Sequence, residues 1–242
     1  MPITQSNEGG ITDIVIDVPP VNALAVDDWF ALADALDDIS EDARVVIVRA
    51  EGRGFCAGVD IKELQADPQA IVEVNRGCAA AFAAVYECDV PVIAAVHGFC
   101  LGGGVGIAGN ADVVIASRDA TFGLPEVDRG ALGAATHLAR LVPQHRMRHM
   151  LYTGDTASAE ELHGYGSVLE VVERGELEGA ARKVAEAVAA KHPTIIRRAK
   201  ESVNGIDPVD PRRSYRFEQG FTFELNVSGV AGEVRDTFGD DS

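Results

Sequence analysis

The apolar residues of the first 50 positions change their period along the chain. Within residues 11–18 the apolar residues Ile14, Ile16 and Val18 alternate on one face, which is typical of a strand. Asp27 and Asp28 then precede a helical pattern that we expect them to cap. Its apolar face has spacings of three and four and comprises Trp29, Leu32, Ala33, Leu36 and Ile39. The unbroken apolar run within residues 44–50 indicates a strand buried on both sides, so this strand-helix-strand unit predicts a parallel sheet.

The same alternation recurs further along the chain and then stops. The patterns predict helices over 70–87 and 101–108, and buried strands over 90–96 and 113–116. After residue 131 strands nearly vanish, and the predicted helices cover 131–141, 160–164, 178–192, 194–204 and 212–226. The sequence therefore predicts an α/β fold, with a core over residues 1–190 and a helical region over 191–242. A chain of 242 residues fits one large domain.

Composition and charge exclude several classes of partner. The 21 Lys and Arg against 38 Asp and Glu give a net charge of −17, which repels nucleic acids and anionic membranes. Pro91, His97 and six glycines interrupt the one long apolar run, over 90–109, so it does not predict a membrane span. The four cysteines form no Cys-x-x-Cys pair, and the first residues do not read as a secretion signal. We expect reduced buried thiols, no metal site and a cytoplasmic location.

Two glycine-containing turns follow predicted strands and offer backbone to a ligand. Residues 51–63 contain the small residues Ala57 and Gly58, and Asp60 is suited to begin a helix. Residues 100–106 place three consecutive glycines at a helix start, where N–H groups can stabilise a carbonyl oxygen that gains charge. The alternatives are a tight turn at the first site and close helix packing at the second.

A third segment, residues 121–130, carries a candidate for proton transfer. Glu126 lies between Pro125 and Val127 in an apolar stretch beyond a buried strand. Such surroundings favour a carboxyl group with a raised pKa. The alternative is a solvated glutamate on a loop.

Taken together, the three segments resemble the crotonase (enoyl-CoA hydratase/isomerase) superfamily in both order and spacing, and the resemblance covers nearly the whole chain. It implies a spiral of ββα turns, C-terminal helices that complete a homotrimer or homohexamer, and an acyl-CoA substrate without a prosthetic group. It implies that the N–H groups of Val59 and Gly103 form an oxyanion hole for the thioester. It also places Asp60, Ile61 and Lys62 beside Val59 along the path of the coenzyme A.

One departure from the superfamily bears on the reaction. Its hydratases carry two glutamates, whereas this chain has Gly106 at the first position and keeps only Glu126. Addition of water across a double bond needs an acid and a base, so a hydratase is not expected. One glutamate suits an isomerase or a hydrolase. Further segments resemble the hydrolases of the superfamily that open ring D in cholesterol catabolism; these segments are 49–55, 85–88, 122–138 and 218–225.

This second resemblance implies hydrolysis of a carbon–carbon bond in a bicyclic dione acyl-CoA, through a dienolate that the oxyanion hole stabilises. The alternatives are an enoyl-CoA isomerase or hydratase-like enzyme of acyl-CoA metabolism, and a non-catalytic CoA-binding subunit. His137 is a candidate to polarise the ketone or orient water, or else it is a core or capping histidine. Asp128 and Arg129 are candidates for an ion pair that positions Glu126, or else they form a surface pair.

The C-terminal region carries two further expectations. The predicted helix over 212–226 has more aromatic surface than a solvent-facing helix leaves exposed, so we expect it to pack on the core or on a neighbouring subunit. The superfamily's basic C-terminal segment is largely absent here. We therefore expect Lys62, Arg53 or Arg235 to offset the repulsion between this acidic chain and the phosphates of coenzyme A.

Overall fold

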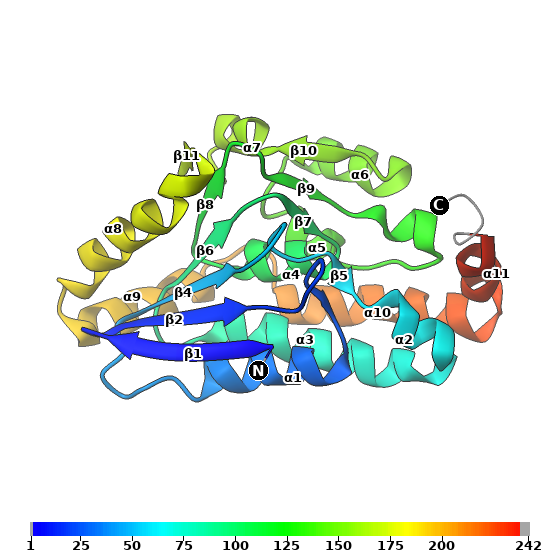
Figure 1. Ribbon diagram of the computed structural model, residues 1–242, viewed down its shortest axis with the longest axis horizontal. Coiled ribbons are helices and arrows are strands. Elements are labelled where there is room, and N and C mark those ends of the chain that lie inside the picture. The colour runs from blue at the N-terminus through cyan, green and yellow to red at the C-terminus, as the bar shows by residue number, and fades with distance from the viewer. Residues whose placement is uncertain (1, 238–242) are drawn as a thin grey trace.

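Figure 1 shows the computed structural model, which describes residues 2–237. The strands are β1 (Ile3–Glu8), β2 (Ile11–Ile16), β3 (Ala23–Leu24), β4 (Val45–Ala50), β5 (Gly58–Val59), β6 (Val92–Val96), β7 (Phe99–Leu101), β8 (Val113–Ser117), β9 (Thr121–Gly123), β10 (Thr156–Ser158) and β11 (Glu170–Val172). The α-helices are α1 (Val26–Asp37), α2 (Ile61–Ala66), α3 (Ile71–Glu87), α4 (Gly103–Asn110), α5 (Ala135–Leu138), α6 (Gln144–Thr153), α7 (Ala159–Tyr165), α8 (Leu177–Ala189), α9 (Pro193–Gly205), α10 (Pro211–Val227) and α11 (Val230–Thr237). Short 3-10 helices are η1 (Pro68–Ala70), η2 (Pro125–Arg129) and η3 (Arg174–Glu176).

The strands form one large sheet and two small ones. The large sheet has the order β1-β2-β4-β6-β8-β11, and every pair in it is parallel except β1 with β2. Each of β2, β4, β6 and β8 is followed by a short strand that pairs outside this sheet, and then by a helix. The chain therefore repeats a ββα turn, as the resemblance implied, and the short strands β5, β7 and β9 carry the three glycine-containing segments.

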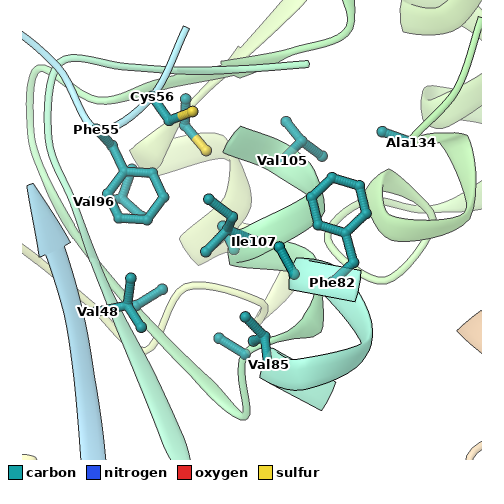
Figure 2. Close-up of a cluster of buried hydrophobic side chains, with 14 of the residues drawn as sticks. Val48, Phe55, Cys56, Phe82, Val85, Val96, Val105, Ile107 and Ala134 are labelled. Carbon is teal, nitrogen blue, oxygen red and sulfur yellow. The ribbon is translucent and has the colours of Figure 1, made fainter. Parts of the chain in front are cut away.

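Helices cover both faces of the large sheet (Figure 1). On one face α8 packs its alanine stripe, including Ala181 and Ala185, against residues such as Ile47 and Ile93. On the other face α1, α3 and α4 enclose the larger cluster, part of which Figure 2 shows around Phe82 and Ile107. Burial from both sides explains why β4 and β6 have no polar alternation.

The structure corrects two predicted boundaries. Helix α1 begins after Ala25 rather than under a cap from Asp27 or Asp28, and the Asp28 carboxylate instead accepts a hydrogen bond from the Ala25 N–H. Of the predicted helix over 131–141, only the four residues of α5 and a following turn are helical. Gly133 and Ala134 have positive φ angles, which bend the chain before α5 begins.

Strand β1 was not predicted from the sequence. Five of its six residues are exposed, so it has no apolar alternation, and its backbone hydrogen bonds to β2 at the sheet edge define it. The four cysteines are buried free thiols, as predicted.

The predicted helices of the C-terminal region are present as α9 and α10, followed by α11. Helix α10 packs on α3 and α5, and α11 packs on η2. Phe223 packs against the core, whereas Phe217 and Phe221 are exposed. No helix within residues 2–237 is long and apolar enough to cross a membrane. The division of the chain at residue 190 stays a prediction.

Candidate active site

Backbone hydrogen bonds join the three glycine-containing segments into one unit. The Phe55 N–H donates to the His97 carbonyl at 2.9 Å, and the Leu101 N–H donates to the Cys56 carbonyl at 2.9 Å. The Gly102 N–H donates to the Gly123 carbonyl at 3.0 Å. The first and third segments therefore lie on either side of the second, although about 70 residues separate them in the chain.

Two glycines allow these segments to approach closely. Gly98 has a φ of 61°, and a Cβ there would lie 2.3 Å from the Arg53 carbonyl oxygen. Gly58 has a φ of 92°, and a Cβ there would lie 3.2 Å from the Gly103 nitrogen. Any side chain at Gly58 would push β5 away from the start of α4. The backbone around Val59 thus lies beside that of Gly103.

A cavity of about 560 Å³ opens at this junction. The residues predicted for the oxyanion hole and the path of coenzyme A line it, together with the predicted proton-transfer residue; these are Val59, Asp60, Ile61, Lys62, Gly103 and Glu126. Arg53, also expected to act on the coenzyme A phosphates, is not among the residues that line it. The Asp60 side chain accepts a hydrogen bond from the Lys62 N–H and so begins α2, as predicted. Gly103 is the first residue of α4, where N–H groups have no carbonyl partner within the helix.

Glu126 lies on η2 at the inner wall of this cavity. Its Oε2 atom is buried and has no hydrogen-bond partner among the described residues. Burial raises the pKa of this carboxyl group to about 8, and repulsion from the Glu218 carboxylate adds to the rise. Glu126 is therefore a partly exposed residue with a buried carboxylate oxygen and a pKa of about 8, which suits a group that accepts and returns a proton.

The position of the missing second glutamate is filled by an aromatic ring. A Cβ on Gly106 would lie 2.2 Å from the Phe82 Cζ atom. Figure 2 shows Phe82 beside the helix that carries Val105 and Ile107. The phenyl ring thus lies against α4 where a side chain at residue 106 would project, and the glycine makes this packing possible.

His137 does not line the cavity that contains Glu126. It lines a second cavity of about 470 Å³, and Phe82 and Tyr215 line both. Burial lowers the pKa of His137 to about 3, so the imidazole is neutral, and its Nδ1 atom lies 3.0 Å from Asn110 Nδ2. The sequence left two interpretations of His137, a catalytic group or a core or capping histidine. This placement favours the core histidine.

Asp128 and Arg129 lie on η2 but in different surroundings. Asp128 is exposed and approaches Gly154, where a Cβ would lie 2.5 Å from the Asp128 Oδ2 atom. Arg129 lines the cavity, and burial lowers its pKa while the charge of Asp128 raises it. Arg235 also lines the cavity and hydrogen-bonds to the Ala231 carbonyl and the Asn226 side chain.

Several residues of the cavity were not predicted from the sequence. Tyr215 on α10 and Cys78 on α3 are buried and line it. Glu218 is not among the residues that line the cavity; it accepts hydrogen bonds from the N–H groups of Ala135 and Thr136 and so holds the start of α5. Tyr215, Gln219 and Thr222 of α10 are spaced by four and three residues and so lie on one face of the helix. All three are buried, so this polar face points into the protein, and its spacing is the feature of the sequence that could have identified it.

The described part of the chain contains no group of three or more His, Cys, Asp or Glu side chains placed to bind a metal ion. The cavity instead combines backbone N–H groups, one carboxyl group with a raised pKa, that of Glu126, and largely apolar walls. Such a site can stabilise an oxyanion and move a proton.

Comparisons with known proteins agree with this geometry. Residues 6–219 match the family described as Enoyl-CoA hydratase/isomerase. The chain is 61% identical to the (7aS)-7a-methyl-1,5-dioxo-2,3,5,6,7,7a-hexahydro-1H-indene-carboxyl-CoA hydrolase of Rhodococcus jostii, over 98% of this chain and 94% of that protein. It is 59% identical to the Mycobacterium tuberculosis protein of the same name, over 98% of both chains. An enoyl-CoA hydratase/isomerase structure from Xanthobacter autotrophicus superposes with a TM-score of 0.86 at 26% identity, covering 93% of this chain and 87% of that one. The chain therefore belongs to the enoyl-CoA hydratase/isomerase family and has the crotonase fold.

Proposed function

We propose that this protein hydrolyses a carbon–carbon bond in a bicyclic dione carried as a CoA thioester, the reaction that opens steroid ring D in cholesterol catabolism. The observation that carries the proposal is the Phe82 ring at Gly106, which leaves Glu126 without a second carboxylate. The identity of about 60% to the two indene-carboxyl-CoA hydrolases, over nearly their whole length, supports the same substrate.

The first step uses Glu126 as a base. The carboxylate takes a proton from a water molecule, and the hydroxide adds to the ring ketone carbon. The tetrahedral intermediate then collapses, and the bond between the ketone carbon and the ring-fusion carbon breaks. The electron pair passes through the ring double bond to the thioester, which forms a dienolate.

The N–H groups of Val59 and Gly103 receive the charge on the thioester oxygen. Donors preorganised in this way lower the barrier by about 3 kcal/mol each in acyl-transfer enzymes. Glu126 then returns its proton to carbon, and the former ketone becomes a carboxylic acid that ionises. Asp60, Ile61 and Lys62 also line the cavity. In this proposal they bind coenzyme A, and the Lys62 charge offsets that of its phosphates.

The test follows one oxygen atom. In ¹⁸O-labelled water the wild-type protein incorporates one labelled oxygen into the new carboxyl group of the ring-opened thioester. Glu126→Gln removes the base but preserves the shape of the side chain, so turnover stops while acyl-CoA binding persists. Glu224 is an exposed carboxylate on α10. Glu224→Gln is therefore the matched control, and we expect it to retain full activity.

The same assay separates the alternatives. An isomerase interconverts simple 3-enoyl and 2-enoyl thioesters and leaves the dione intact, and a binding subunit converts neither compound. Either result with the wild-type protein contradicts the proposal.

The assembly is part of the proposal. Phe217 and Phe221 are 71% and 45% exposed and pack edge to face with ring centroids 5.2 Å apart, which is an apolar surface suited to a neighbouring subunit. We expect a homotrimer or homohexamer by light scattering. A fully active monomer of 25.6 kDa contradicts this expectation.

A further inference from the structure

The ring ketone needs a hydrogen-bond donor of its own, because its oxygen gains a charge that the oxyanion hole for the thioester cannot reach at the same time. Tyr215 is a buried phenol that lines the cavity containing Glu126. Its ring is fixed from two sides. The ring centroids of Phe82 and His137 lie 5.1 and 4.9 Å from that of Tyr215.

The hydroxyl group of Tyr215 lies close to two other polar side chains. Gln219 favours the ionised form of Tyr215, and Tyr215 favours the ionised form of the Cys78 thiol, so each lowers the pKa of its neighbour against the effect of burial. Gln219 is itself held, since its Nε2 atom donates to the Asn75 carbonyl at 2.6 Å and its Oε1 atom accepts from Arg216 at 2.8 Å. Sulfur is a weak acceptor, so a carbonyl oxygen of a ligand competes readily for the phenol proton.

Tyr215 and Glu126 lose their protons in different pH ranges. Burial raises the pKa of Tyr215 well above 10, and the charges of Cys78, Glu218 and Glu126 add to this rise. The phenol therefore keeps its proton throughout the pH range in which Glu126 ionises. One group is poised to donate a hydrogen bond while the other accepts a proton.

Several other donors around the cavity are less suited to this role. The Thr222 hydroxyl already donates to the Leu132 carbonyl. His137 lies in the second cavity, behind Phe82 and Tyr215. Arg129 and Arg235 also line the cavity, but Arg235 already donates to the Ala231 carbonyl and the Asn226 side chain, and the charge of Asp128 acts on Arg129.

We propose that Tyr215 is a catalytic residue that donates a hydrogen bond to the ring ketone oxygen, polarises the carbonyl group and holds the alkoxide that forms when hydroxide adds. This inference rests on the proposed function. The phenol keeps its proton throughout: Glu126 takes the proton of water, the carbon–oxygen bond forms, and the alkoxide collapses as the carbon–carbon bond breaks. The phenol then faces the oxygen of the new carboxyl group.

The test compares two buried tyrosines. Tyr215→Phe removes the donor, and we expect kcat to fall about 100-fold, as after loss of one oxyanion donor. The affinity for free coenzyme A and the rise of activity with pH stay unchanged, because both depend on other groups. Tyr86→Phe is the matched control, because Tyr86 is also buried, donates to the Asn204 carbonyl and does not line the catalytic cavity.

A second measurement does not depend on turnover. In the Glu126→Gln protein, the infrared band of a ¹³C-labelled ring ketone is expected at lower frequency than in solution, and Tyr215→Phe in that background restores the solution frequency. A Tyr215→Phe protein as active as Tyr86→Phe, or an unshifted band, overturns the role of Tyr215. A wild-type protein that leaves the dione intact instead overturns the proposed function.

Discussion

The carboxylate of Glu126 lies directly against the Cα atom of Gly102. A Cβ at Gly102 would lie 2.6 Å from the Glu126 Oε1 atom, and the backbone there has a φ of 54°. The same residue precedes α4, whose first N–H belongs to Gly103. The proposed base and the proposed oxyanion hole are thus placed against each other through a residue that has no side chain.

Gly102→Ala is therefore expected to displace the base. The methyl group pushes the carboxylate aside, and a displacement of about 1 Å is enough to lower kcat about 100-fold. Steady-state kinetics measure the effect. Gly52→Ala is the control, since Gly52 also has a positive φ but has no atom within 4 Å of a Cβ position. Equal losses of activity in the two variants would mean that backbone strain, and not contact with Glu126, is responsible.

Activity is expected to rise with pH. Glu126 accepts a proton only as a carboxylate, and its pKa is about 8, so kcat/KM increases tenfold per pH unit below this value and levels off above it. A profile that is flat between about pH 6 and 9 is incompatible with Glu126 as the base.

The same shift makes a prediction about stability. The pKa of Glu126 is higher in the folded chain than its ordinary value of 4.5, so the fold favours the protonated form. The resulting stabilisation is complete below pH 4.5 and is lost as the pH rises to about 8. Glu126→Gln stays neutral, and its free energy of unfolding in urea should exceed that of the wild type more at pH 8 than at pH 5. An equal difference at both pH values would contradict the raised pKa.

Restoring a glutamate at Gly106 is expected to fail for a steric reason. Gly106→Glu forces Phe82 out of its place, and even Gly106→Ala is expected to cost about 1–3 kcal/mol by overpacking. Neither change improves the native reaction. Denaturant unfolding measures the cost, with Gly179→Ala on α8 as the control, because no atom lies within 4 Å of its Cβ position. A stable Gly106→Glu protein with a faster native reaction would contradict the interpretation that the reaction needs no carboxylate at position 106.

Glu218→Gln tests the support of α5 and of the base together. The amide has one acceptor oxygen for the N–H groups of Ala135 and Thr136, so stability is expected to fall by about 1–3 kcal/mol. Loss of the negative charge also lowers the pKa of Glu126, which moves the pH profile to lower pH. Glu224→Gln on the same helix changes neither. An unmoved profile in the Glu218→Gln protein would mean that its charge does not reach Glu126.

The sequence by itself determined the parallel sheet, most helices and the predicted residues of the cavity. The apolar runs of β4 and β6 are local signals, because strands buried on both faces must be apolar throughout. The motifs around Val59, Gly103 and Glu126 are also local, since each needs its own turn. Their order and spacing indicated the family. The reaction was indicated by Gly106 and by the resemblance of further segments to the ring-D hydrolases.

Only the tertiary structure decided what surrounds Glu126. Phe82 lies on α3 and Tyr215 on α10, far from Glu126 in the chain, and no local pattern records that three separate elements meet at one cavity. The pKa of Glu126 depends on the same packing, because burial by distant residues sets it. His137 is the opposite case. Its neighbours in the sequence indicated a place in the site, but in the structure its ring packs against Phe82 and Tyr215 and lies outside the catalytic cavity.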